Sequence, residues 1–223
     1  MDSNVSVVIP VGPYPANKKW LKECIESVVN QTVHSQIVII DDMAKITNDD
    51  LGGIEPDVFF NTPWLIGVAG AFNFGVALAK TECVFMLGSD DTLDPDCLYE
   101  CLIKHNVTRK SNCYYWVGVR YMDTVEKQFL PCHAAMVTKS LWRNCGGFAP
   151  ECSVGAPDAA LISTFMVNKS AGEIVCVNSK RTLYNYRRHN NSDTAGRHPW
   201  QKVILQTRDI LSKTWQKPQW NRM

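Results

Sequence analysis

The chain has 223 residues, a formal net charge of +1 and nine cysteines. This length suits one α/β domain with a full hydrophobic core, and the near-zero charge argues against a nucleic-acid-binding surface. No apolar run is long enough to span a bilayer, and the first residues lack the basic and apolar regions of a signal peptide. With an odd number of cysteines and no signal peptide, we expect a reducing compartment and a cytoplasmic protein.

The first half of the chain alternates predicted helices and strands. Helices are predicted over residues 18–30, from an apolar stripe at helical spacing, and over 67–80, where glycines favour close packing. Short apolar runs predict three strands buried on both faces: Val5–Ile9, Gln36–Ile40 and Val84–Leu87. The first of these strands is expected to stop at Pro10. The alternation predicts an α/β fold with a parallel sheet of the nucleotide-binding kind.

The second half combines strand signals with irregular loops, which predicts a mixed sheet on the other side of a cleft. The expected elements are strands over 114–122, 134–137, 174–177 and 183–186, a short helix through Leu141 that ends at Gly146-Gly147, a helix over 159–168 and a final helix from Pro199. The basic residues Lys202, Arg208 and Lys213 of the final helix suit a solvated surface or a weak membrane-surface contact. We therefore expect a single domain over 1–223, divided into halves 1–96 and 97–198 and a C-terminal helix over 199–223.

The stretch Thr81–Asp96 carries the main chemical signal. The apolar run within it ends abruptly at Gly88-Ser89, and Asp90 and Asp91 follow at once. Asp94-Pro95 then resembles an N-cap followed by proline at the first helical position. Two adjacent carboxylates at the carboxyl end of a strand suit a divalent cation that also binds substrate phosphates. The alternative is a solvated turn rich in aspartate.

Two common nucleotide-binding folds are excluded by the residues after the strands. A dinucleotide fold needs a glycine fingerprint after the first strand, and only Gly12 follows Pro10. A phosphate-binding loop of the kinase type needs Gly-Lys-Ser or Gly-Lys-Thr, and neither tripeptide occurs. What remains is a fold that handles phosphates through a cation held by carboxylates.

Ordered motifs along nearly the whole chain resemble the inverting glycosyltransferases of family 2, which have the GT-A fold. In the first half these motifs are Val5–Pro10, Cys24–Thr32, Val38–Asp42, Gly67–Gly75 and Ser89–Asp91. In the second half they are Gly146–Phe148, Pro157-Asp158 and Tyr186–His189. Each motif alone is a weak signal, and the ordered set is far more specific.

The resemblance implies roles for particular residues. Asp42 is similar to the residue that hydrogen-bonds the uracil of a UDP-sugar, and Asp90 to the carboxylate that holds the ribose. Asp91 resembles the ligand that bridges Mn²⁺ or Mg²⁺ to the diphosphate, with His189 as a second group near the metal. Asp158 stands where the family keeps its catalytic base. Further nucleotide-sugar contacts are expected at Pro10, Val11, Gly67 and Asn73.

These roles agree with the chemistry of inverting transfer, which needs one base on the acceptor side and stabilisation of the leaving diphosphate opposite. Simpler interpretations stay open for two of the residues. Asp158 could serve only as the N-cap of the helix that follows it. His189, at the basic end of a strand, could be an ordinary surface histidine.

The sequence departs from the family pattern at several positions. Phe72 replaces a usual arginine, and Gly88 replaces the first aspartate of the acidic turn. Gly12-Pro13 replaces a usual tyrosine-asparagine pair, which makes Tyr14 the candidate for stacking on the base. His133 occupies the approach to the acceptor, where it either contacts a sugar or caps a turn.

We therefore expect a metal-dependent inverting glycosyltransferase that moves a hexose or deoxyhexose from a UDP-sugar to a carbohydrate acceptor. A nucleotidyltransferase of related topology is the first alternative, although residues 10–15 lack the basic side chains that such a loop uses to bind a triphosphate. A non-catalytic nucleotide-sugar binder is the second.

Overall fold

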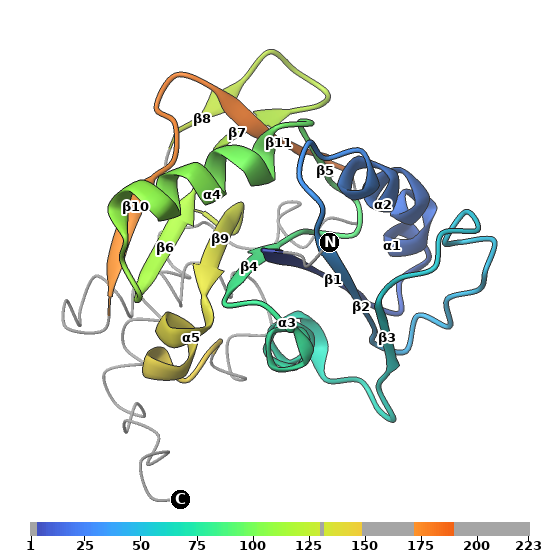
Figure 1. Ribbon diagram of the computed structural model, residues 1–223. Coiled ribbons are helices and arrows are strands. Elements are labelled where there is room, and N and C mark those ends of the chain that lie inside the picture. Colours follow the sequence, from blue (N-terminus) through green and yellow to red (C-terminus); the bar gives the residue numbers. More distant parts are fainter. Residues whose placement is uncertain (1–3, 130–131, 149–171, 190–223) are drawn as a thin grey trace, which may run out of the picture.

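The computed structural model describes residues 4–129, 132–148 and 172–189, and its centre is a seven-stranded sheet (Figure 1). In spatial order the strands are β10 (Glu173–Cys176), β6 (Cys113–Trp116), β9 (Ala135–Thr138), β4 (Cys83–Met86), β1 (Val5–Val11), β2 (Gln36–Asp41) and β3 (Val58–Asn61). A second, four-stranded sheet has the order β5 (Thr92–Leu93), β11 (Thr182–Tyr186), β7 (Gly118–Tyr121) and β8 (Lys127–Gln128).

The strands of the first half are parallel, as predicted. β1 pairs in parallel with both β2 and β4, and β2 pairs in parallel with β3. β9 lies antiparallel between β4 and β6, so the sheet is mixed in its second half, also as predicted. We call the edge at which β1, β2 and β4 end the carboxyl edge, and the opposite edge the amino edge.

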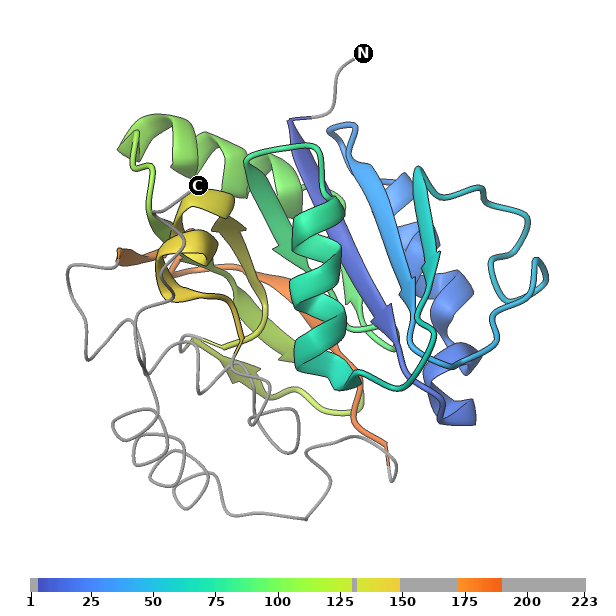
Figure 2. The same cartoon turned by 90° about the horizontal axis from the view of Figure 1, so that it is seen from below.

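Two helix layers cover the seven-stranded sheet, as Figures 1 and 2 show. α2 (Leu21–Val29) and α4 (Cys97–Thr108) bury their apolar stripes on one face, together with Val7 and Ile9 of β1 and Tyr184 of β11. α3 (Gly67–Leu78) and α5 (Lys139–Cys145) cover the other face, where Val8 points. Every residue of β1 is buried, as expected for a strand covered on both sides.

β1 continues through Pro10 to Val11, contrary to the expected stop. The Val8 carbonyl accepts a hydrogen bond from Leu87 N at 3.1 Å. The backbone N–H and C=O groups of the even-numbered residues of β1 therefore point toward β4. Pairing with β4 ends at Val8, opposite Met86. Because β4 has no partner residue beside Pro10, the missing N–H costs no ladder hydrogen bond.

Three other local predictions differ from the structure. The strand expected over 114–122 is two strands, β6 and β7, that belong to different sheets. The helix expected over 18–30 is also divided, because α1 (Pro15–Lys19) ends at Trp20 before α2 begins. After the acidic turn, β5 intervenes and α4 begins at Cys97 with Asp96 as its N-cap, so Asp94 does not hold that position.

Some predictions lie outside the described residues. These are the helices over 159–168 and from Pro199, together with Asp158 and the basic residues Lys202, Arg208 and Lys213. Within the described ranges, every helix is too short or too polar to cross a lipid bilayer.

Candidate active site

The site is built around the tight turn that follows β4. Gly88 N donates a hydrogen bond to the Tyr184 hydroxyl at 3.1 Å, and Asp91 N donates to the Gly88 carbonyl at 3.2 Å. A Cβ atom at Gly88 would lie 2.8 Å from Asp91 Oδ2 and 3.1 Å from Asp90 Oδ1. A side chain at Gly88 would therefore have to displace the carboxylate of Asp91, so glycine suits this turn as it stands.

Asp91 points inward from this turn and is 2% exposed. Its Oδ2 accepts a hydrogen bond from the Tyr184 hydroxyl at 2.6 Å, and its Oδ1 accepts one from Arg187 N at 2.7 Å. Both donors come from the end of β11, a strand more than ninety residues away in sequence. The carboxylate thus connects the acidic turn to the second sheet.

The electrostatic setting of Asp91 is unfavourable for its charged form. Burial, followed by the neighbouring Asp90 carboxylate, raises the pKa of Asp91 to about 7. His133 and the hydrogen bonds from Tyr184 and Arg187 N act in the opposite direction without cancelling that rise. Two carboxylates next to each other in a partly buried turn form a place where added positive charge is stabilising.

Asp90 points toward the open side of the same turn and faces His189. The distance between Asp90 Oδ2 and His189 Nε2 is 2.8 Å, and their side chains are 21% and 13% exposed. The His189 ring also contacts the Trp20 ring in a tilted arrangement, with ring centroids 4.7 Å apart. The structure therefore brings His189 to the acidic turn as predicted, but its partner is Asp90 and not Asp91.

His133 reaches the turn from the segment that leads into β9. Because β9 runs antiparallel to β4, its first residue lies opposite Met86 at the carboxyl edge. His133 Nε2 lies 3.9 Å from Asp91 Oδ2, and its ring contacts the rings of Tyr184 and Tyr186 at 5.3 and 5.5 Å between centroids. The residue predicted on the acceptor side is therefore part of the same cluster.

A second acidic pair lies at the end of β2. Asp41 accepts three backbone hydrogen bonds from residues 44–46, so it shapes the loop that follows. Asp42 is 2% exposed and accepts hydrogen bonds from Thr62 Oγ1, Ile66 N and Gly67 N, at 2.8 to 2.9 Å. Asp42, predicted to contact uracil, thus also fixes the turn that begins α3.

The remaining residues predicted to contact the nucleotide lie at the end of β1 and at the start of α3. Pro10 and Val11 lie buried at the end of β1, where the Val11 carbonyl accepts from Asp42 N at 2.8 Å. Tyr14 lies just beyond them and is 61% exposed, so its ring can stack on a planar base. Gly67 opens α3 with a φ of 72°, and its N–H binds Asp42.

Asn73 has a structural use that the sequence did not reveal. Its Nδ2 donates to the Phe148 carbonyl and its Oδ1 accepts from Phe148 N, both at 2.8 Å. The side chain therefore clamps α3 to the Gly146-Gly147 turn after α5, and the nucleotide contact expected of Asn73 stays a prediction. Phe72, at the position of the missing arginine, is buried against Phe148 with ring centroids 5.6 Å apart.

The described residues offer a limited donor set for a divalent cation. Within these residues, no group of three or more His, Cys, Asp or Glu side chains has the arrangement of a complete metal site. Asp90 Oδ2 and His189 Nε2 converge from two different elements, and a magnesium-type site needs only one or two protein ligands when phosphates supply the rest. These two side chains fit such a cation, and they are more exposed than the carboxylate of Asp91, which is 2% exposed and points inward to Tyr184 and Arg187 N.

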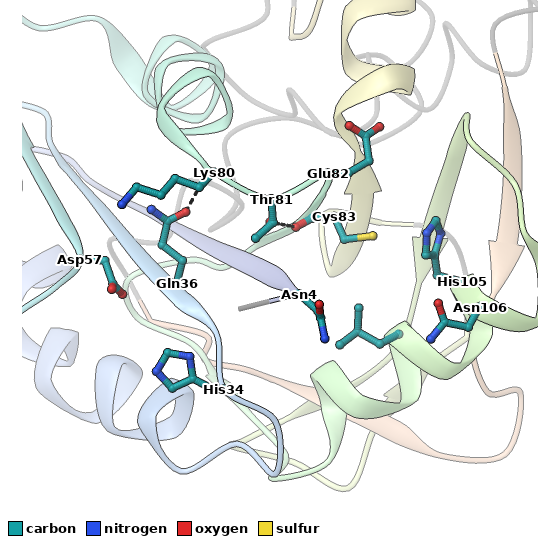
Figure 3. A pocket seen from close by; sticks show the side chains of 11 residues that line it. Asn4, His34, Gln36, Asp57, Lys80, Thr81, Glu82, Cys83, His105 and Asn106 are labelled. Carbon is teal, nitrogen blue, oxygen red and sulfur yellow. Dashed lines mark hydrogen bonds between the residues drawn. The ribbon is translucent and has the colours of Figure 1, made fainter. Parts of the chain in front are cut away.

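A cavity of about 750 Å³ lies at the amino edge, away from this site (Figure 3). Its lining residues precede or begin β1, β2, β3 and β4 or lie on α4: Asn4, His34, Gln36, Asp57, Lys80, Thr81, Glu82, Cys83, Leu102, His105 and Asn106. Gln36 Oε1 accepts from Ser6 Oγ and Lys80 N, while its buried Nε2 has no partner among the described residues. The size of this cavity does not make it the reactive site, because the converging carboxylates and imidazoles lie at the other end of the strands.

Sequence reasoning missed three residues of the site: Tyr184, Arg187 and Trp20. Tyr184 and Arg187 act through hydrogen bonds that cross between the two sheets, and no local pattern reports such pairing. Trp20 lay inside a predicted helix and showed no signal of its own. The basic Tyr186–His189 motif was the one available pointer to this segment.

Comparison with known proteins shows the family to which the chain belongs. The chain matches the family model described as glycosyl transferase family 2 over residues 6–169. It is 28% identical to Escherichia coli chondroitin synthase over 168 residues, which cover 65% of this chain and 24% of that protein. It is 32% identical to Pasteurella multocida hyaluronan synthase over 123 residues, which cover 51% of this chain and 13% of that protein.

Solved structures show the same fold at low sequence identity. A crystal structure of S. aureus TarS 1–349 in complex with UDP-GlcNAc superposes with a TM-score of 0.74 at 13% identity, covering 96% of this chain and 68% of that one. The complex of the same fragment with UDP gives a TM-score of 0.70. The chain spans less than a quarter of each of the two curated relatives. Because the family model matches well over half of its length, the chain belongs to glycosyl transferase family 2 and has the GT-A fold.

Proposed function

We propose that this chain is the catalytic unit of a metal-dependent glycosyltransferase that transfers a hexose or deoxyhexose from a UDP-sugar to a carbohydrate acceptor with inversion. The observation that carries the proposal is the fixed cluster of Asp90, Asp91, His133 and His189 at the carboxyl edge of a family 2 sheet. In open α/β sheets, ligands bind outside this edge.

UDP is the proposed nucleotide because the TarS structures of the same fold hold UDP and UDP-GlcNAc. Tyr14 offers an exposed ring beside the end of β1. A carboxylate has about four lone-pair sites, and Asp42 uses three of them within the chain. The fourth is available to accept the ring N–H of uracil, which keeps the predicted role for Asp42.

We assign the cation to Asp90 and His189, because the carboxylate of Asp91 is turned inward to Tyr184 and Arg187. When bound there, Mn²⁺ or Mg²⁺ would neutralise charge on the departing diphosphate as a Lewis acid. Asp91 then acts from behind the turn, where its negative charge favours a cation at Asp90.

The general base stays a prediction. Asp158 lies outside the described residues, and its role is inferred from the family resemblance alone. His133 is the nearest described candidate on the acceptor side, 3.9 Å from Asp91. The carbohydrate acceptor is proposed from the chondroitin and hyaluronan synthase relatives, of which this chain spans only a part.

The test is a transfer assay with a panel of UDP-hexoses, a mixture of oligosaccharide acceptors, and Mn²⁺ or a chelator. We expect UDP release that needs both acceptor and metal, and a product whose anomeric configuration, read by NMR, is opposite to that of the donor. No UDP release or UDP binding under any of these conditions would contradict the proposal. Pyrophosphate release from UTP and a sugar phosphate would instead identify a nucleotidyltransferase.

Asp158→Asn separates the two interpretations of that residue. Asparagine still caps a helix but cannot take a proton at neutral pH. We expect a loss of about 10²- to 10⁴-fold in transfer rate with unchanged UDP affinity and melting temperature. Transfer at the wild-type rate would exclude Asp158 as the base, and His133→Gln would then be the next variant to measure.

A further inference from the structure

The contacts of Arg187 point to a role beyond those assigned to the site residues above. We infer that Arg187 is a positioning residue that holds the Asp90-Asp91 turn and His189 in the arrangement that receives a nucleoside diphosphate and its cation. The inference rests on the proposed function. It concerns how the site is preorganised, because Arg187 makes its contacts behind the residues assigned to the ligand.

Arg187 joins three parts of the chain at one point. Its backbone N–H donates to Asp91 Oδ1 at 2.7 Å, and its Nε donates to the Asp90 carbonyl at 2.8 Å. Its Nη2 donates to Glu23 Oε2 on α2 at 2.6 Å. The end of β11, the acidic turn and α2 are therefore connected through a single residue.

The geometry requires an arginine. The guanidinium carries separate N–H groups that point in fixed directions, so Nε and Nη2 serve two acceptors at once. A lysine has the same charge but a single ammonium group on a flexible stem, and it cannot reproduce both bonds in this arrangement. The side chain of Arg187 is 18% exposed, which fits a structural contact better than a solvated charge.

Trp20 completes the arrangement from the other side. The Arg187 guanidinium lies 5.0 Å from the centre of the Trp20 ring, and the His189 ring contacts the same indole at a tilt, with centroids 4.7 Å apart. Trp20 occupies the break between α1 and α2, which frees its side chain from the helical register of either helix. One indole thus supports both Arg187 and the imidazole that faces Asp90.

The hydrogen bonds of the Arg187 side chain differ in how much they contribute to the arrangement of the site. Glu23 is 50% exposed, so its ion pair with Arg187 is screened by water and contributes little. The Nε bond to the Asp90 carbonyl lies inside the turn and fixes the backbone of the residue that faces His189. Loss of this bond should therefore matter more than loss of the Glu23 contact.

Arg188 provides a matched control in the next position of the chain. It also pairs with two carboxylates, Asp123 and Glu126, and it also lies over an aromatic ring, that of Tyr121, at 4.4 Å. Its partners belong to β7 and the segment after it, and none of its contacts involves Asp90 or Asp91. The two arginines differ in whether they touch the acidic turn and in exposure, since the side chain of Arg188 is 39% exposed and that of Arg187 is 18% exposed.

The test compares Arg187→Lys, Arg188→Lys and Glu23→Gln by calorimetric titration with UDP, with and without Mg²⁺, alongside melting temperature. We expect Arg187→Lys to lose about tenfold or more of its UDP affinity in Mg²⁺ and little of its affinity without the metal. The reason is that the variant loses the charge-assisted hydrogen bond from Arg187 Nε to the Asp90 carbonyl. Arg188→Lys should stay within about twofold of wild type under both conditions, and Glu23→Gln should lose only about two- to threefold.

Wild-type affinity in Arg187→Lys with Mg²⁺ would overturn the inference, and so would an equal loss in Arg188→Lys. If Arg187→Lys fails to fold, Trp20→Phe tests the same arrangement, because the smaller ring keeps the hydrophobic contact but weakens the support of Arg187 and His189. An unchanged Mg²⁺-dependent part of UDP affinity in that variant would also overturn the inference. Wild-type protein that binds no UDP at all would instead overturn the proposed function, on which the inference rests.

Discussion

The two edges of the seven-stranded sheet differ in how their polar groups are used. At the carboxyl edge, buried carboxylates accept hydrogen bonds from donors in distant elements, as Asp91 does from Tyr184 and Arg187. At the amino edge, a cavity of about 750 Å³ is lined mostly by polar side chains that start strands, and Asn4, Asp57 and Lys80 among them are exposed.

The edge proposed to bind the donor is therefore the one whose side chains are held by hydrogen bonds from distant elements. A donor site must hold charged groups at defined positions before the substrate arrives, because catalysis by electrostatic stabilisation depends on preorganisation. The carboxyl edge meets that condition through hydrogen bonds between sheets.

The largest expected effect concerns Asp91 and pH. Its pKa in the folded state, about 7, lies above the ordinary 3.8 of aspartate, so the folded state holds this proton longer than the unfolded state. The stability that comes from the protonated form is present below about pH 4 and is lost as pH rises to about 7. The difference corresponds to roughly 4 kcal/mol at 1.36 kcal/mol per pH unit.

Asp91→Asn should remove this pH dependence. Denaturant melts of both proteins in a chelator, at intervals from pH 4 to pH 8, give the free energy of unfolding of each. We expect the variant to gain stability relative to wild type as pH rises, on top of a constant offset from its altered hydrogen bonds. A difference that does not change with pH would show that Asp91 titrates normally.

Asp90→Asn should give the next largest effect. If Asp90 and His189 hold the cation, UDP affinity in Mg²⁺ should fall about tenfold to a hundredfold, and the metal-free affinity should change little. Calorimetric titration with UDP measures both values. Equal affinities of wild type and variant in Mg²⁺ would return the metal role to Asp91 or remove it from this turn.

Tyr184→Phe tests the connection between the sheets. The hydroxyl donates to Asp91 Oδ2 and accepts from Gly88 N, and the residue is fully buried. Its removal leaves two buried polar groups without this partner, so we expect a cost of about 1–3 kcal/mol in the free energy of unfolding. A chemical denaturation curve measures it, and a change below about 0.5 kcal/mol would mean that the turn is held by other contacts.

The smallest effect is expected at the amino edge. Asp57 accepts a hydrogen bond from Ile37 N at 2.7 Å, and asparagine can replace it as acceptor. Asp57→Asn should therefore leave UDP affinity within about twofold of wild type, with or without Mg²⁺, in the same titration. A loss comparable to that of Asp90→Asn would place the nucleotide at the amino edge, which would contradict the proposed site.

Much of the fold was predictable from local patterns. Strands β1, β2 and β4 are apolar runs buried on both faces. The apolar residues of α3 and α5 recur at helical spacing, and α5 ends at Gly146. β3 was missed because it is a short edge strand whose residues alternate between partly buried and exposed. The division between β6 and β7 was missed because the strand signal continues across Val117, where the chain passes from one sheet to the other.

The candidate site was predictable only in part. The acidic turn and His189 follow from motifs that are local in sequence. The inward direction of Asp91 depends on Tyr184 and Arg187, which are ninety-three and ninety-six residues away, and only the folded chain shows that pairing. The clamp of Asn73 on Phe148 is of the same kind, since it depends on where α5 ends relative to α3.

Backbone amide NMR can map directly where UDP and Mg²⁺ bind on the chain. We expect chemical-shift changes at the carboxyl edge, at Val11, Asp42 and Asp90, and none at the start of β2 or β4. Changes confined to Gln36, Thr81 and Cys83, beside the large cavity, would contradict this expectation.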